Sequence, residues 1–165
     1  MQLNVIKLTE AHCKEICSWR YPAPYDIYNW PAWEVMLAEE LQFADPSIRD
    51  AQFAGVVQLG DTQTAELLGY VQYFPMEGLT RLGVGLKPSL CGQGLSALFM
   101  NAILLEAQLR NPTHEIDLEV HTWNKRAQKT YVKAGFVCAD EYERETPTGI
   151  GRFYCMEYSK NKPNP

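Results

Sequence analysis

One stretch of the sequence, residues 80–97, constrains the fold more strongly than any other. In the run TRLGVGL, alternate apolar residues predict one face of a strand, whereas Gly83 and Gly85 leave the other face bare, which favours the close approach of a ligand. Pro88 follows and cannot donate a hydrogen bond to a neighbouring strand, so we expect strand pairing to stop there.

Two more glycines, Gly92 and Gly94, come next, and a helical pattern runs from about Gln93 to Arg110. Glycines here let backbone N–H groups converge at the start of a helix, where the helix dipole adds about half a positive charge. Such a site binds phosphate oxygens without any lysine. An ordinary strand-to-helix turn explains the same glycines by sterics, so the interpretation depends on the rest of the sequence.

Length and composition narrow the class of protein. At about 150 residues per domain, the 165 residues predict a single domain over 1–165, with a polar tail at 158–165. Hydrophobic residues make up 46% of the chain, which is enough for a core. The net charge of -5 argues against a nucleic acid or an anionic membrane as the main partner.

The five cysteines form no C-x-x-C pair, which favours a reducing compartment over a disulfide framework. No run approaches the roughly 18 apolar residues of a membrane span, and we expect a cytoplasmic protein. Cys13 and Cys17 share a helical face beside His12. Because buried apolar cysteines are far commoner than zinc ligands, we predict no metal site.

The hydrophobic pattern predicts the order of elements. The expected strands are 2–8, 51–59, 66–74, 80–86, 115–122, 136–144 and 152–158, and the expected helices are 10–19, 31–43, 93–110 and 124–134. Thr9 is the expected N-cap of the first helix, and Pro31 is the expected first residue of the second. The aromatic loop 19–33 either caps the core or walls an acceptor pocket, and 60–64 joins two strands. The predicted fold class is α/β, a single-domain mixed, mostly antiparallel sheet with helices on both faces.

A second stretch, LEVHTWNKRAQKTYVKAGF, resembles the GNAT superfamily of acyl-CoA-dependent N-acyltransferases. The matching residues are Leu118, Val120, Asn124, Ala127, Tyr131, Gly135 and Phe136. The family's loop pattern, Q/R-x-x-G-x-G/A, is matched in part by CGQGLS, where Cys91 replaces the polar first residue and Ser96 the last small one. The resemblance covers Leu82 to Phe136.

This resemblance implies a central strand pair that splays apart and acetyl-CoA as co-substrate. It implies that the backbone of Val84, Gly85 and Leu86 pairs with the pantetheine arm. The pyrophosphate would be held by Gly92, Gln93, Gly94, Leu95, Ser96 and Ala97. Asn124 would lie near the cofactor, and as the residue before a helix it is also a plain N-cap.

Tyr131, which matches the family's helix tyrosine, is the first catalytic candidate. It lies seven positions after Asn124 on nearly the same helix face, and its phenol can donate a proton to a departing CoA thiolate. A core aromatic that packs beside Ala127 and Ala134 explains the same spacing.

Glu119 is the candidate base, because it resembles a glutamate in the same Leu-Glu-Val setting of some protein N-terminal acetyltransferases. The solvent-exposed face of a strand would also explain the alternation of Glu115, Asp117, Glu119 and His121. His121, Glu77 or an ordered water are the alternative proton acceptors.

We therefore expect an N-acetyltransferase that transfers an acetyl group from acetyl-CoA to a primary amine by direct attack in a ternary complex. A non-catalytic acyl-CoA-binding module or sensor is the alternative. A nicotinamide dinucleotide site fits poorly, because antiparallel strands precede Gly92 and position 114 is histidine instead of an acid. The sequence leaves open whether the acceptor is a metabolite, an antibiotic amine, a polyamine or a protein amino group, and a homodimer is among the oligomeric states it allows.

Overall fold

The computed structural model describes residues 2–59 and 65–159 and divides into two compact units. The first unit comprises Met1–Gln72 and Val84–Leu95, and the second comprises Tyr73–Gly83 and Ser96–Pro165. Two strands, β3 (Ala65–Met76) and β4 (Leu79–Leu86), contribute residues to both units. The predicted connection 60–64 and the end of the predicted polar tail lie outside the described residues.

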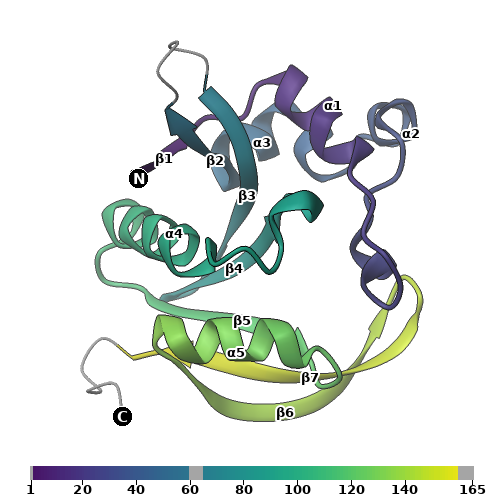
Figure 1. Cartoon of the computed structure of the whole chain (residues 1–165). Coiled ribbons are helices and arrows are strands. Elements are labelled where there is room, and N and C mark those ends of the chain that lie inside the picture. Colours follow the sequence, from purple (N-terminus) through teal and green to yellow (C-terminus); the bar gives the residue numbers. More distant parts are fainter. Residues whose placement is uncertain (1, 60–64, 160–165) are drawn as a thin grey trace. The chain divides into compact units, whose positions relative to one another are not determined.

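The other elements each fall within one unit. Figure 1 labels the helices and strands along the chain. The first unit contains β1 (Leu3–Ile6), α1 (Glu10–Ser18), η1 (Tyr25–Tyr28), α2 (Trp33–Ala38), η2 (Gln42–Ala44), α3 (Pro46–Gln52), β2 (Phe53–Leu59) and η3 (Pro88–Leu90). The second unit contains α4 (Ser96–Arg110), β5 (Glu115–His121), α5 (Lys125–Ala134), β6 (Phe136–Thr146) and β7 (Gly149–Tyr158).

Over the described ranges, seven strands lie in the order β1-β2-β3-β4-β5-β7-β6. Antiparallel pairs are β1 with β2, β2 with β3, β5 with β7, and β6 with β7. A parallel pair joins β4 to β5, with Leu79 opposite Glu115 and Leu82 opposite Leu118 as its end pairs. The predicted mixed, mostly antiparallel sheet with helices is therefore confirmed.

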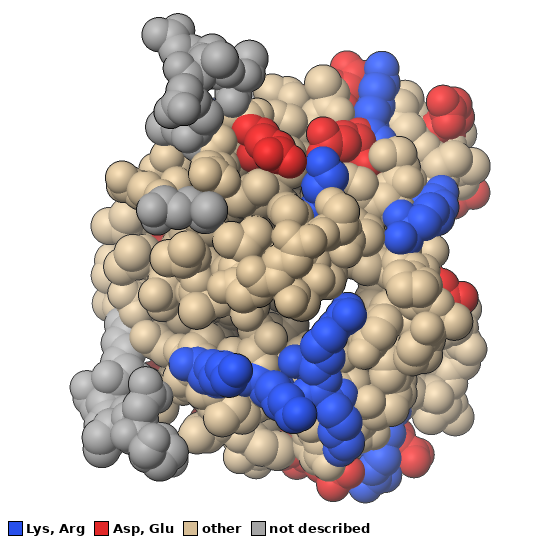
Figure 2. Space-filling view, viewed as in Figure 1, with Lys and Arg blue, Asp and Glu red and all other residues tan. Residues whose placement is uncertain are grey.

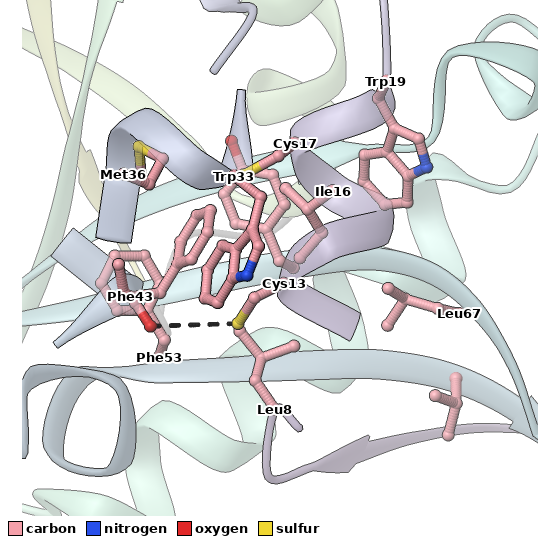
Figure 3. Packing of buried hydrophobic residues seen from close by; sticks show 13 residues of the cluster. Leu8, Cys13, Ile16, Cys17, Trp19, Trp33, Met36, Phe43, Phe53 and Leu67 are labelled. Atoms are coloured by element: carbon pink, nitrogen blue, oxygen red, sulfur yellow. Dashed lines mark hydrogen bonds between the residues drawn. The ribbon is translucent and has the colours of Figure 1, made fainter. Parts of the chain in front are cut away.

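The core of the first unit packs α1, α2 and η2 against β2 and β3 (Figure 3). On α1, the spacing of Cys13, Ile16 and Cys17 places all three on one buried face. Thr9 caps this helix as predicted, since its side chain accepts from the His12 backbone N–H while His12 Nδ1 accepts from that of Thr9. The ring of Phe43 meets Trp30 and Phe53 edge to face, at centroid distances of 4.9 and 5.5 Å.

The predicted helix 31–43 is wrong in its extent. The α-helix covers only Trp33–Ala38, and positive φ angles at Glu40 (52°) and Gln42 (45°) end its regular geometry. Trp33 and Met36 provide its buried face.

The sequence interpretation also missed α3, which precedes β2. Asp45 caps it by accepting from the Ser47 backbone N–H at 2.8 Å, and Pro46 occupies its first turn. The Asp-Pro-Ser sequence is thus a helix start, and β2 begins at Phe53, later than the predicted position 51.

In the second unit, the core includes one face of α4 and the apolar face of β5. The buried residues of α4 are Phe99, Met100, Ile103, Leu104 and Ala107, and those of β5 include Ile116, Leu118 and Val120. Gly135 ends α5 in the left-handed conformation, with a φ of 107°, as a helix C-cap requires. None of the helices in the described part of the chain is both long enough and apolar enough to span a membrane.

Candidate functional site

The end of β4, which the sequence analysis assigned to ligand pairing, lies in the first unit. Val84, Gly85 and Leu86 are half-buried, and the Leu86 carbonyl accepts a hydrogen bond from the Tyr21 hydroxyl at 2.6 Å. The face that Gly85 leaves bare is filled by the chain itself, because a Cβ there would overlap the ring of Tyr70. Any ligand on this segment must therefore use the backbone edge of β4.

The glycine turn after β4 has the backbone geometry of an open loop. Gly92 and Gly94 adopt positive φ angles of 76° and 78°, and a Cβ built on either would meet nothing within 4 Å. A side chain would therefore be strained by the backbone and not by crowding. The predicted start of the helix at Gln93 is wrong, because the left-handed Gly94 interrupts any helix and α4 begins at Ser96.

The residues of the predicted phosphate loop fall in different units by sequence: the first unit contains Gly92, Gln93, Gly94 and Leu95, and the second contains Ser96 and Ala97, in the first turn of α4. Gln93 Nε2 donates to the Ser89 carbonyl at 2.8 Å, which folds this exposed side chain back onto the loop. The Cys91 thiol lies 3.7 Å from the Lys87 carbonyl.

Asn124 and Tyr131 both belong to the second unit. Asn124 is buried, and its Oδ1 accepts from the Ala127 backbone N–H at 3.1 Å, so its N-cap role is confirmed. Tyr131 is half-buried on α5, and its ring contacts Phe136 edge to face at 6.0 Å between centroids. Contact with the ring of Phe136 restrains the ring of Tyr131.

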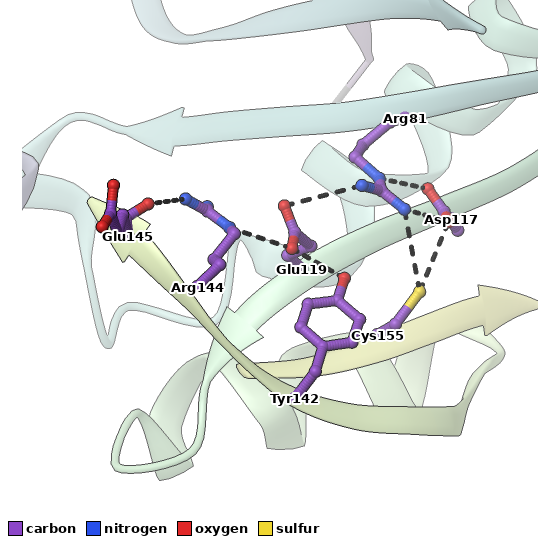
Figure 4. A network of polar contacts seen from close by, with 7 residues as sticks. All are labelled: Arg81, Asp117, Glu119, Tyr142, Arg144, Glu145 and Cys155. Carbon is purple, nitrogen blue, oxygen red and sulfur yellow. Dashed lines mark hydrogen bonds and ion pairs between the residues drawn. The ribbon is translucent and has the colours of Figure 1, made fainter. Parts of the chain in front are cut away.

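Glu119 is held by several donors (Figure 4). Its Oε2 accepts from the Tyr142 hydroxyl at 2.7 Å and from Arg144 Nε at 3.1 Å, whereas Oε1 lies 3.7 Å from Arg81 Nη1. Burial and the hydrogen bond to Glu119 raise the pKa of Tyr142, so this phenol remains a donor at neutral pH. Oε1 is the less occupied of the two oxygens.

Asp117, two residues earlier on β5, is buried and fully paired. Arg81 donates to both of its oxygens, at 2.9 and 2.8 Å, and the hydrogen bond raises the pKa of Arg81. The Cys155 thiol lies 3.3 Å from Asp117 Oδ2, and burial is the main reason why its pKa rises to about 11. The interpretation as a solvent-exposed face is therefore wrong for Asp117, which is buried and paired with the half-buried Arg81.

The sequence interpretation did not identify the partners Arg81, Tyr142 and Arg144. Arg81 lies opposite Asp117 in the pairing of β4 with β5, and this register is known only from the structure. Tyr142 and Arg144 alternate on β6, but their facing neighbours depend on a bulge near Cys138 that no sequence pattern marks.

His121 follows on the same face of β5. Its ring stacks on Trp123 at 5.3 Å and lies 4.2 Å from Phe153, measured between centroids. Burial, followed by the charge of Arg144, lowers the pKa of His121 below 6.5, although the charge of Glu119 opposes this. The imidazole is therefore neutral at pH 7. Glu77, the other side chain proposed as an alternative proton acceptor, is exposed in the turn between β3 and β4.

The cysteines that suggested a metal site belong to the hydrophobic core. Cys13 and Cys17 are buried, and the Cys13 thiol donates to the Phe43 carbonyl at 3.9 Å (Figure 3). Burial raises the pKa of Cys17 to about 11. His12 is engaged in the cap of α1, so these three residues have structural roles.

Helix α5 carries a basic surface on an acidic chain. Figure 2 shows Lys and Arg side chains gathered over the region of α5 in Figure 1. The exposed cations of this helix are Lys125, Arg126, Lys129 and Lys133, and its sequence KRAQKTYVKA contains no acid. This arrangement produces a local positive field that suits an anionic ligand.

Acetyltransferases are among the solved structures with a similar fold. A chimera of the spermidine N-acetyltransferase SpeG from Vibrio cholerae and hSSAT is 17% identical, with 96% of this chain and 95% of that chain covered and a TM-score of 0.71. AAC(6')-Ib in complex with paromomycin and acetyl-CoA is 19% identical, with 97% and 94% covered and a TM-score of 0.69. At these identities the likeness shows the fold.

The family is shown by a match to the sequence itself. The model of the acetyltransferase (GNAT) family matches residues 13–136, which include both motifs and most of the chain. The sequence pattern, the mixed sheet and the glycine turn before α4 agree with this match. The chain belongs to the acetyltransferase (GNAT) family.

Proposed function

We propose that this acetyltransferase transfers an acetyl group from acetyl-CoA to a primary amine by direct attack in a ternary complex. The observation that carries the proposal is the open turn before α4, where Gly92 and Gly94 combine left-handed geometry with free space beside each Cα. Backbone N–H groups in such a turn can approach phosphate oxygens closely, and the substitutions at Cys91 and Ser96 leave that backbone intact.

In this proposal, residues 92–97 hold the pyrophosphate, and the backbone of Val84, Gly85 and Leu86 pairs with the pantetheine arm. The side chain of Asn124 lies near the cofactor in this proposal and also caps α5. The exposed cations of α5 support an anionic cofactor, because they attract negative charge in a chain whose net charge is -5.

Proton transfer is assigned to Tyr131 and Glu119. The amine nitrogen forms the new C–N bond as the thioester C–S bond breaks, Tyr131 gives its proton to the thiolate, and Glu119 accepts the proton that the amine loses. The restrained ring of Tyr131 supports the first role. The contact of Glu119 Oε1 with Arg81, at 3.7 Å, leaves room for a proton on that oxygen.

His121 is the alternative proton acceptor, and a specific observation favours it. Its imidazole is neutral at pH 7, whereas the Glu119 carboxylate lies against Arg81 and Arg144. The imidazole accepts a proton only in its neutral form, so a rate that is lost as the pH falls through the pKa of His121 favours the imidazole as the base.

The acceptor is proposed to be a cationic amine. Similar structures carry the names of a spermidine N-acetyltransferase and of AAC(6')-Ib with paromomycin, so polyamines and aminoglycosides come first in a screen. The five free thiols fit a reducing cytoplasm. A homo-oligomer is part of the proposal, since one similar structure is described as dodecameric.

The test is release of free thiol from acetyl-CoA in the presence of a panel of amines, together with calorimetric binding of acetyl-CoA. Thiol release that depends on one class of amine supports the enzyme. Binding of acetyl-CoA without thiol release across the whole panel favours the sensor, and failure to bind it contradicts both.

A further inference from the structure

The peptide between Leu86 and Lys87, at the end of β4, is held on both of its sides within the first unit. The Lys87 N–H donates to the Leu68 carbonyl on β3 at 2.8 Å, and the Leu86 carbonyl accepts from the Tyr21 hydroxyl at 2.6 Å. Because the C=O and N–H of a trans peptide point in opposite directions, Tyr21 lies at the edge of β4 that faces away from β3. The Cys91 thiol also points at the Leu86 carbonyl, but at 3.9 Å it is a much weaker donor than the Tyr21 hydroxyl.

The loop that carries Tyr21 is itself fixed. The Tyr21 backbone N–H donates to Asn29 Oδ1 at 2.8 Å, which closes the loop on itself. Trp30 Nε1 donates to the buried Tyr70 hydroxyl at 3.0 Å, and the Tyr70 ring lies against Gly85. The aromatic loop 19–33 is therefore tied to β3 through Trp30 and to β4 through Tyr21.

We propose that Tyr21 is a positioning residue for the pantetheine arm. Its hydroxyl fixes the Leu86 carbonyl and so defines the end of the backbone edge along which the arm pairs. The inference rests on the proposed function, in which Val84, Gly85 and Leu86 supply that edge.

Two physical arguments support this role. A carbonyl oxygen has two lone pairs, so Leu86 can accept from Tyr21 and still accept from an amide of the arm. A peptide that is already fixed before the ligand arrives loses less conformational freedom on binding, which strengthens the complex. The sequence did not reveal this contact, because Tyr21 and Leu86 are 65 residues apart.

The test compares Tyr21→Phe with the wild type by calorimetry, using two probes. Acetyl-CoA contains the arm, whereas adenosine bisphosphate is the CoA fragment that lacks it. We expect Tyr21→Phe to bind acetyl-CoA about three- to tenfold more weakly, the effect of one net hydrogen bond, and to bind adenosine bisphosphate as the wild type does. The matched control is Tyr154→Phe, which removes a hydroxyl from β7 in the second unit and should change neither affinity.

The outcomes separate the two proposals. If the wild type binds neither probe, the proposed function fails. If the wild type binds acetyl-CoA and Tyr21→Phe binds it equally well or more tightly, the positioning role is overturned while the proposed function stands. Equal weakening for both probes also overturns it, because a general loss of structure would act on the phosphates and on the arm alike.

Discussion

The ring of Tyr70 occupies the space that a side chain at Gly85 would need. A Cβ at Gly85 would overlap the ring carbons and lie 2.7 Å from the hydroxyl oxygen. Tyr70 is buried, and burial raises its pKa to about 12, so it is a neutral phenol that accepts from Trp30. The glycine at position 85 thus serves the packing of an aromatic ring across β4.

The first prediction follows from this contact. Gly85→Ala should lower the free energy of unfolding by about 1–3 kcal/mol, as overpacking does, in chemical denaturation. In a Tyr70→Leu background, Gly85→Ala should lower the free energy of unfolding by much less, because the ring that the new methyl group would meet is absent. An equal cost in both backgrounds would show that Tyr70 is not the cause.

A second prediction concerns the phosphate turn. Gly94→Glu puts bulk and negative charge at the proposed cradle and should abolish calorimetric binding of acetyl-CoA in a folded protein. Gly78→Glu is the matched control, since Gly78 also has a positive φ, of 68°, and also has free space around its Cβ. We expect the control to bind acetyl-CoA normally. If Gly94→Glu keeps its affinity for acetyl-CoA, this turn does not hold the pyrophosphate.

Local patterns in the sequence were sufficient for most of the fold. Alternation located β4, β5 and β7, and the cap residues Thr9 and Asn124 marked helix starts, because these signals act within a few residues. The failures were also local. Helix α3 was missed because it has only seven residues, counted from Pro46, which are too few for a periodic pattern.

The site was less accessible to sequence reasoning than the fold. Glycine positions and the Asn124 to Tyr131 spacing lie within single segments, so they could be identified. The Tyr21 hydroxyl that donates to the Leu86 carbonyl comes from a distant segment. The donors to the Glu119 carboxylate are also distant, since Tyr142 lies 23 residues from Glu119. Contacts of this kind follow from strand order and register, which a single sequence does not specify.

Tyr131→Phe is predicted to lower kcat at least about tenfold while the affinity for acetyl-CoA stays close to that of the wild type, as expected for loss of a proton donor. The ring and its contact with Phe136 remain, so thermal stability should change little. Steady-state kinetics with a thiol readout measures the effect. Unchanged turnover would exclude Tyr131 from the chemistry.

Glu119→Gln tests the proposed base. We expect kcat/KM to fall at least about tenfold across the pH range, since the amide cannot accept the proton. Glu115→Gln, at an exposed position on the same strand, is the matched control and should leave kcat/KM unchanged. If Glu119→Gln keeps its activity and His121→Gln loses it, the base is the imidazole.

His121 should also leave a signature in the pH dependence of stability. Its pKa is lowered from 6.5 by burial first and by Arg144 second, so the unfolded chain takes up the proton at a higher pH than the folded protein. The stabilisation is therefore complete above pH 6.5 and is lost as the pH falls through the folded pKa. Urea unfolding from about pH 7.5 to about pH 5 should show this slope in the wild type and a smaller one in His121→Gln. Arg144→Gln, which removes the second cause, should also reduce the slope, and identical slopes in all three proteins would contradict the assignment.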